Sequence, residues 1–97
     1  MLRRRPVPGL QQIDVETLRE KMGRHEKLKI VDVREAQEFE AGHIPGALNL
    51  PLGRIPYTAK NELSPEEEIV LVCRSGNRSM TAARLLHKIG YKKLYNL

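Results

Sequence analysis

The sequence contains a single cysteine, Cys73, no tryptophan and few aromatic residues, namely three tyrosines and one phenylalanine. A lone cysteine excludes an internal disulfide, and with it the small secreted scaffolds that disulfides hold together. An exposed thiol keeps its reactivity best in a reducing compartment, so the expected location is cytoplasmic. The low aromatic content also leaves little surface for stacking nucleic-acid bases.

Long apolar segments are missing as well. No stretch approaches the roughly 20 apolar residues that span a bilayer, and the N-terminus lacks the apolar core of a secretory signal. Residues 1–10 are instead basic and proline-rich, with Arg3, Arg4 and Arg5 in a row, and are predicted to be a flexible leader outside the fold. Clustered arginines also follow membrane helices on their inner side, so membrane contact is expected only if a longer natural chain carries an upstream anchor.

The charge balance is basic. The 97 residues include 17 Lys and Arg against 12 Asp and Glu, which gives a formal net charge of +5. This excess suits a small anionic substrate or an acidic protein partner. A nucleic-acid partner is not expected, because the basic residues are scattered apart from the arginine run. The length and the 40% hydrophobic fraction fit one domain, expected over residues 11–97.

Strand and helix patterns alternate along the chain. Apolar and β-branched runs predict strands, and apolar residues at helical spacing predict helices. The predicted strands are 11–13, 28–33, 47–50, 69–72 and 93–97, and the predicted helices are 15–22, 35–41 and 78–89. Residues 51–68 are the least regular stretch, with a short helix expected near 52–55 and then a polar loop through Asn61. The alternation predicts an α/β fold, a central and mostly parallel β-sheet flanked by helices on both faces.

Cys73 stands where the apolar run 69–72 gives way to a polar loop and then to a helical pattern. A thiol in this position faces backbone N–H donors and the positive end of the helix dipole, and both favour the thiolate. Such surroundings bring a cysteine pKa from about 8.5 to about 3.5–7.5. A lone cysteine is more often an inert buried residue, but the polar loop favours a nucleophile here.

The residues after Cys73 complete the predicted site. Arg74 and Arg78 are expected to attract an anionic substrate, with plain surface charge as the alternative interpretation. Gly76 is expected to adopt a positive φ or to let the ligand approach closely. Ser79 either caps the helix or contacts substrate, and the sequence does not separate the two. The predicted substrate-binding loop is therefore Arg74, Ser75, Gly76, Asn77, Arg78 and Ser79.

Three further residues are expected to support this site structurally. Asp32 and Arg34 follow a buried strand, where an ion pair between them or with Glu38 would satisfy their charges. His43 lies in a turn and is expected to form a structural hydrogen bond rather than to act as a base. Cysteine and histidine do not occur with zinc-site spacing, so no metal site is expected.

Three ordered segments resemble the signatures of rhodanese-like sulfurtransferases. They are 30–34 followed by Glu38 and Phe39 and then by 42–47 and 49–51, next 73–79, and finally 90–97. The resemblance covers most of the chain from residue 11 onward and implies the same α/β fold, with Cys73 carrying sulfur as a persulfide and no cofactor besides. It also implies a small anionic sulfur donor such as thiosulfate, a thiol or cyanide acceptor, and a sulfur-relay protein as a further partner.

The sequence departs from the family at its end. The family usually continues with a glycine pair and a helix that bears a tryptophan, whereas this sequence stops at Leu97. The fold is therefore expected to lack the C-terminal closing helix and to expose apolar sheet surface.

Other functions fit parts of the pattern. A phosphatase or arsenate reductase of the dual-specificity kind also holds a cysteine in an anion-binding loop, but that loop is one residue longer than the four residues between Cys73 and Arg78. A regulatory interaction module of the rhodanese type is a second alternative, although such modules often lack the cysteine. A sulfur carrier that feeds one partner enzyme would use the same loop, and the sequence leaves this alternative open.

Overall fold

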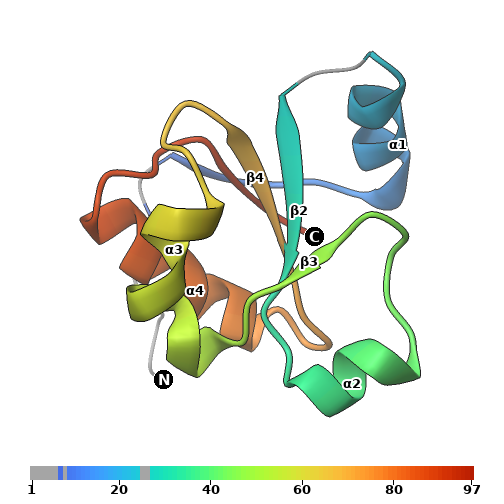
Figure 1. The fold of residues 1–97 in the computed structure, drawn as a ribbon. Coiled ribbons are helices and arrows are strands. Elements are labelled where there is room, and N and C mark those ends of the chain that lie inside the picture. Colours follow the sequence, from blue (N-terminus) through green and yellow to red (C-terminus); the bar gives the residue numbers. More distant parts are fainter. Residues whose placement is uncertain (1–6, 8, 25–26) are drawn as a thin grey trace, which may run out of the picture.

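The computed structural model describes residues 7, 9–24 and 27–97, which form a five-stranded sheet surrounded by helices (Figure 1). The strand order is β1-β5-β4-β2-β3, and each neighbouring pair is parallel. In chain order the elements are β1 (Leu10–Gln12), α1 (Val15–Gly23), β2 (Leu28–Asp32), α2 (Ala36–Ala41), β3 (Leu48–Asn49), the 3-10 turn η1 (Leu52–Arg54), α3 (Ile55–Glu62), β4 (Glu68–Val72), α4 (Asn77–Lys88) and β5 (Leu94–Asn96). The predicted α/β fold is confirmed.

Helices cover the central strand β4 from both sides. Its side chains alternate, so Ile69 and Leu71 join Leu86 of α4 in the larger core cluster, which α3 also supports (Figure 1). Val70 points to the other face and packs with Leu18 of α1 in a smaller cluster. Burial on both faces explains why this strand is an uninterrupted apolar run in the sequence.

The carboxyl ends of β2 and β4 meet at one edge of the sheet. The two strands pair in parallel, with Asp32 opposite Val72 at the end of the register. Cys73 therefore follows β4 beside the end of β2. Helix α2 and the first turn of α4 lie at this same edge (Figure 1). In parallel α/β sheets this is the edge where ligands bind.

Helix α3 corrects the prediction for the irregular stretch. The short helix expected near 52–55 is the turn η1, and α3 continues from it, so Asn61 is helical rather than part of a polar loop. Ile55 and Ala59 lie one turn apart and are fully buried. The Tyr91 hydroxyl donates a hydrogen bond to the Ala59 carbonyl at 3.2 Å. The helix is thus fixed by contacts with distant residues, which the local sequence does not reveal.

The expected leader, residues 1–10, is too long. Val7 is only 7% exposed and packs in the larger core cluster, and Leu10 begins β1 beside β5. Gly9 lies between them with a φ of 80°, and a Cβ at this position would meet the Lys92 carbonyl oxygen at 2.9 Å. The chain therefore joins the fold by residue 7. The arginine run Arg3, Arg4 and Arg5 lies outside the described residues.

An exposed apolar groove lies beside α1. Val15 and Met22 on this helix are 59% and 46% exposed. They line a groove of about 320 Å³ together with Ile44, Pro45 and Leu97. In the part of the chain that the structure describes, none of the helices combines the length and the apolar character needed to cross a membrane.

Candidate active site

Cys73 lies directly after β4, and residues 74–76 lead from it into α4. Gly76 has φ 83° and ψ −10°, which confirms the positive φ, one of the two alternatives expected for it. The nearest neighbour of a Cβ built there is the Asn96 side-chain nitrogen at 3.8 Å, an ordinary contact distance. The backbone angle, and not the space, therefore requires glycine. The turn brings the chain back so that the first amides of α4 face the sulfur.

Three hydrogen-bonding groups converge on the Cys73 sulfur. The backbone N–H groups of Gly76 and Ser79 point at Sγ from 2.9 and 3.4 Å, and the Ser79 hydroxyl oxygen lies 3.1 Å away. Burial of this half-buried side chain raises the pKa of the thiol. The hydrogen bonds from Ser79, Gly76 and the Ser75 N–H outweigh that effect and lower the pKa below its ordinary value. The surroundings therefore favour a thiolate.

Ser79 is fully buried in the first turn of α4. The residue at the N-cap position is Gly76, which makes no side-chain capping bond. Helix capping, one of the two roles considered for Ser79, is therefore wrong. Its hydroxyl is directed at the sulfur of Cys73 instead, and contact with substrate stays a prediction.

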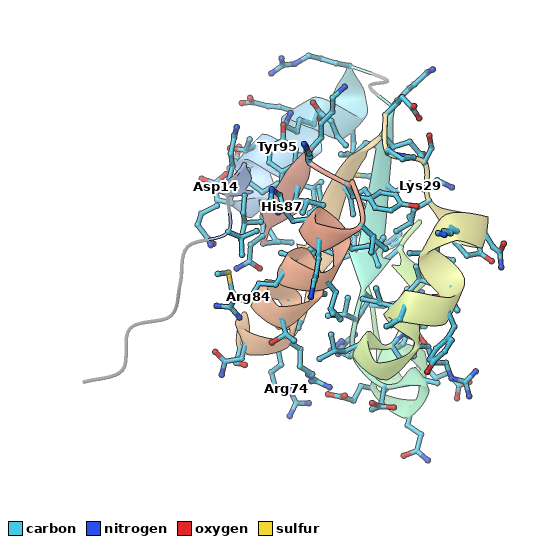
Figure 2. All side chains as sticks on the ribbon, turned by 90° about the vertical axis from the view of Figure 1, so that its left-hand side faces the viewer. Asp14, Lys29, Arg74, Arg84, His87 and Tyr95 are labelled. Atoms are coloured by element: carbon cyan, nitrogen blue, oxygen red, sulfur yellow. The ribbon has the colours of Figure 1, made fainter. Side chains whose placement is uncertain are left out.

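The two arginines of the loop have different surroundings. Arg78 forms a bidentate ion pair with Glu38 of α2. Its Nη1 donates to Oε1 at 2.6 Å, and its Nη2 donates to Oε2 at 2.9 Å. Arg74 is exposed, and its side chain makes no hydrogen bond or ion pair with any residue that the structure describes. Figure 2 shows Arg74 pointing away from the body of the protein near the start of α4. The loop thus presents one arginine to solvent and holds the other against α2.

Glu38 is the site residue whose partner the sequence did not identify. The sequence offered it as an alternative ion-pair partner for Asp32 and Arg34, whereas its carboxylate pairs with Arg78. Its carboxylate also accepts the Glu35 backbone N–H at 3.1 Å, as part of the capping box of α2. The hydrogen bonds from Arg78 and from the Glu35 N–H, with the positive charge of Arg78 beside them, lower the pKa of Glu38 to about 2. Glu38 is therefore fully ionised at neutral pH.

The predicted ion pair between Asp32 and Arg34 is confirmed. Arg34 Nε donates to Oδ1 at 3.0 Å and Nη2 donates to Oδ2 at 2.8 Å. Asp32 is only 1% exposed, so the guanidinium is the group that offsets its buried charge. Nη2 also donates to the Gly42 carbonyl at 2.7 Å. The pair thus ties the end of β2 to the chain that leaves α2.

His43 forms the structural hydrogen bond that was expected. Its Nδ1 donates to the Phe39 carbonyl at 2.7 Å, and its ring stacks on the Phe39 ring with 3.6 Å between centroids and an angle of 11° between planes. Both contacts hold the histidine against α2. The imidazole remains exposed at the edge of the site.

A hollow of about 490 Å³ opens beside the cysteine. The residues that line it are Asp32, Arg34, His43, Ile44, Pro45, Val72, Cys73 and Arg74. The hollow thus combines charged and apolar side chains beside the sulfur. The side chains of Ser75 and Asn77, two other predicted binding residues, are exposed, and the Asn77 N–H donates to Ser75 Oγ at 3.4 Å.

Asn96 is a further residue that the sequence did not single out. It ends β5, is 6% exposed and lies behind the turn at Gly76. Its side-chain oxygen has no hydrogen-bond partner among the described residues. Its position could have been predicted from the strand order, because the end of a strand that pairs in parallel with β4 must lie beside the cysteine loop, residues 73–79.

This fold and this site define a class: α/β proteins that present a cysteine at the carboxyl edge of a parallel sheet. Within the described residues, no three His, Cys, Asp or Glu side chains gather closely enough to hold a metal ion. Residues 14–97 match the family model of the rhodanese-like domain, and the chain belongs to this family.

Individual relatives carry sulfur-related names. The chain is 43% identical over 89 residues to the Bacillus subtilis protein called "Putative sulfur carrier protein YrkF", covering 92% of this chain and 48% of that protein, or about half its length. It is 36% identical over 88 residues to a protein of Allochromatium vinosum named sulfurtransferase, covering 91% of this chain and 81% of the relative.

Solved structures agree with the family assignment. The human single-domain sulfurtransferase TSTD1 aligns with a TM-score of 0.76 at 28% identity, covering 88% of this chain and 86% of the human one. SSP1007 of Staphylococcus saprophyticus aligns with a TM-score of 0.78 at 33% identity, covering 90% of this chain and 85% of that chain. The family, its fold and the sulfurtransferase names of its members thus agree with one another.

Proposed function

We propose that this protein is a sulfurtransferase that carries a sulfane sulfur as a persulfide on Cys73, taking it from thiosulfate and giving it to a thiol or to cyanide. The observation that supports this most directly is the convergence of the Gly76 and Ser79 donors on the Cys73 sulfur. The names of the relatives support a transferase. A reducing compartment such as the cytoplasm would keep the thiolate available.

In the loading step, the Cys73 thiolate attacks the outer sulfur of thiosulfate. A bond forms between Sγ and that sulfur, and the sulfur–sulfur bond of thiosulfate breaks, with its electron pair leaving on sulfite. The negative charge that began on Sγ ends on the terminal sulfur of the persulfide. The N–H groups of the loop are positioned to stabilise this charge, and Arg74 at the edge of the hollow is positioned to attract the donor.

In the unloading step, cyanide or an acceptor thiolate attacks the terminal sulfur. A new bond to that sulfur forms, the bond between the two sulfurs on Cys73 breaks, and its electron pair returns to Sγ as the thiolate. Thiocyanate or the persulfide of the acceptor is released. Each step exchanges one bond to sulfur for another, so neither requires a metal ion or an organic cofactor.

Intact-mass spectrometry tests this proposal. The purified protein is weighed before thiosulfate, after thiosulfate and again after cyanide, with Cys73→Ser treated in parallel. A gain of one sulfur atom that cyanide reverses with release of thiocyanate, and that is absent from Cys73→Ser, is the expected result. A folded wild-type protein that gains no sulfur from thiosulfate or from a small persulfide would refute the proposal.

A sulfur carrier that serves a protein acceptor is the second candidate. The carrier role in the name of the YrkF relative favours it. Ile44 and Pro45 in the lining of the hollow also provide apolar contact surface beyond what a small anion needs. The two candidates differ in the unloading step. A carrier would lose its sulfur to a protein thiol much faster than to an equal concentration of cyanide, whereas a general sulfurtransferase would not.

A further inference from the structure

The ion pair between Glu38 and Arg78 joins two segments that are 40 residues apart in the chain, at the edge of the cysteine loop. Arg78 was expected to receive the anionic donor. Two of its N–H groups are instead bound to a carboxylate, at 2.6 and 2.9 Å. Paired bonds of this kind are among the stronger hydrogen bonds in proteins, and they offset most of the charge on the guanidinium.

We propose that Glu38 is a positioning residue that determines how strongly the cysteine loop attracts anions. It holds Arg78 against α2 and offsets its charge, which leaves Arg74 as the arginine that meets the anionic end of the donor. This inference rests on the proposed function for the identity of the donor. The electrostatic effect on Cys73 that it describes does not depend on sulfur transfer.

The location of Arg78 explains why its pairing matters. Arg78 is the second residue of α4, next to Ser79, whose N–H and hydroxyl both contact the sulfur. An anchor on Arg78 therefore fixes the turn that supplies these donors. Glu38 is itself fixed, because its carboxylate accepts the Glu35 N–H and its side chain is only 25% exposed. The pair is thus a nearly neutral unit, in which both side chains are hydrogen-bonded, at the turn that faces the Cys73 sulfur.

Substitutions that remove the charge of Glu38, of Arg78 or of both distinguish this role of Glu38 from direct binding of the donor by Arg78. Glu38→Gln removes a negative charge and releases Arg78, so the loop attracts anions more strongly. Arg78→Gln leaves Glu38 unpaired, so the loop repels them. The double variant Glu38→Gln/Arg78→Gln removes both charges and returns the loop close to wild type. If Arg78 bound the donor directly, the double variant would remain as weak as Arg78→Gln.

The experiment compares alkylation of Cys73 by iodoacetate, an anion, with alkylation by neutral iodoacetamide. The ratio of the two rates reports the electrostatic potential at the sulfur and cancels changes in the reactivity of the thiolate. Glu38→Gln should raise the ratio about threefold to tenfold at low salt, Arg78→Gln should lower it by a similar factor, and the double variant should restore it. Glu40→Gln is the matched control, because Glu40 is exposed on the same helix.

Equal ratios in Glu38→Gln and Glu40→Gln would overturn the inference. If Glu38→Gln fails to fold, a comparison of Arg78→Gln with the double variant decides, since only restoration in the double variant supports the role of Glu38. With thiosulfate as substrate, KM should fall in Glu38→Gln, rise in Arg78→Gln and return close to the wild-type value in the double variant. If the alkylation ratios change as predicted but the protein never accepts sulfur from a donor, the proposed function is refuted and the electrostatic role of Glu38 is still supported.

Discussion

The hydroxyl oxygen of Ser79 lies 3.1 Å from the sulfur of Cys73, and the backbone N–H of the same serine points at that sulfur from 3.4 Å. One fully buried residue therefore supplies two hydrogen-bonding groups to the sulfur. The hydroxyl can be removed by substitution, whereas the N–H remains. The contribution of the side chain to the thiolate can thus be measured separately.

Ser79→Ala is predicted to lower the reactivity of Cys73. The hydroxyl stabilises the charged form of the sulfur, so its loss raises the thiol pKa and reduces the thiolate fraction at neutral pH. A hydrogen bond to a charged group contributes about 1.5–3 kcal/mol, which corresponds to a fall of roughly tenfold or more in the alkylation rate at pH 7. The measurement is the iodoacetamide rate as a function of pH. Thr81→Ala is the control, because the Thr81 hydroxyl donates to the Asn77 carbonyl, away from the sulfur.

Gly76→Ala is predicted to destabilise the fold and to disrupt the loop. An alanine at φ 83° is strained by about 1–2 kcal/mol even though the space around it is open. In a domain of this size, such a loss lowers the melting temperature by roughly 5–15 °C. Gly53→Ala provides the comparison, because its backbone is not left-handed and a Cβ there meets nothing within 4 Å. Equal melting temperatures for the two variants would contradict the argument.

The local parts of the site are the parts that the sequence predicted. An apolar run that ends in a cysteine, followed by a polar loop with a glycine and then a helix, indicates the strand, the turn and the thiolate together, because these features depend on neighbours in the chain. The ion pair of Asp32 with Arg34 was predictable for the same reason. The sequence also predicted that two arginines would lie in the loop, but not that they would have different surroundings.

The partner of Arg78 was not predictable, because it depends on distant residues. Glu38 lies 40 positions away, and although it belongs to the first family signature, nothing in the sequence indicates that it pairs with Arg78. Asn96 behind the turn at Gly76 is a similar case, because strand pairing brings it there. Helix α3 was misplaced because burial of its apolar side decides its position, and that burial is supplied by other parts of the fold.

Arg34→Met is predicted to destabilise the protein by about 3 kcal/mol, because it leaves the Asp32 carboxylate buried without its cation. Urea unfolding followed by circular dichroism measures the loss. Glu20→Gln on the surface of α1 is the comparison. It removes an ion pair with Arg24 whose side chains are 64% and 67% exposed, so the expected change is below about 1 kcal/mol. Similar losses of unfolding free energy in Arg34→Met and Glu20→Gln would show that the burial of Asp32 does not determine how much its ion pair contributes to stability.

Phosphatase activity is predicted to be absent. Only four residues separate Cys73 from Arg78, and the Arg78 guanidinium is engaged by Glu38, so it is not available to bind a phosphate group in the loop. The measurement is hydrolysis of p-nitrophenyl phosphate by the wild type and by Cys73→Ser. Turnover that disappears in Cys73→Ser would contradict this prediction and favour the phosphatase alternative.

The acid stability of the fold should depend on Glu38. Its pKa falls from an ordinary value of 4.5 to about 2 in the folded protein. A carboxyl group whose pKa is lower in the folded state than in the unfolded state stabilises the fold at pH values above the unfolded pKa. That contribution declines as the pH falls from about 4.5 and is gone once the pH passes below about 2. The free energy of unfolding of the wild type should therefore drop across this interval.

Variants separate this contribution from those of the other carboxyl groups. Glu38→Gln cannot titrate, so its free energy of unfolding should be lower than that of the wild type at pH 6 and should fall less steeply between pH values of about 4.5 and 2. The two curves should converge at the acid end, where Glu38 is protonated in both states. Glu40→Gln, on the same helix, should keep the slope of the wild type. Chemical unfolding at a series of pH values provides the curves, and parallel curves for the wild type and Glu38→Gln would show that the ion pair with Arg78 adds nothing to folding.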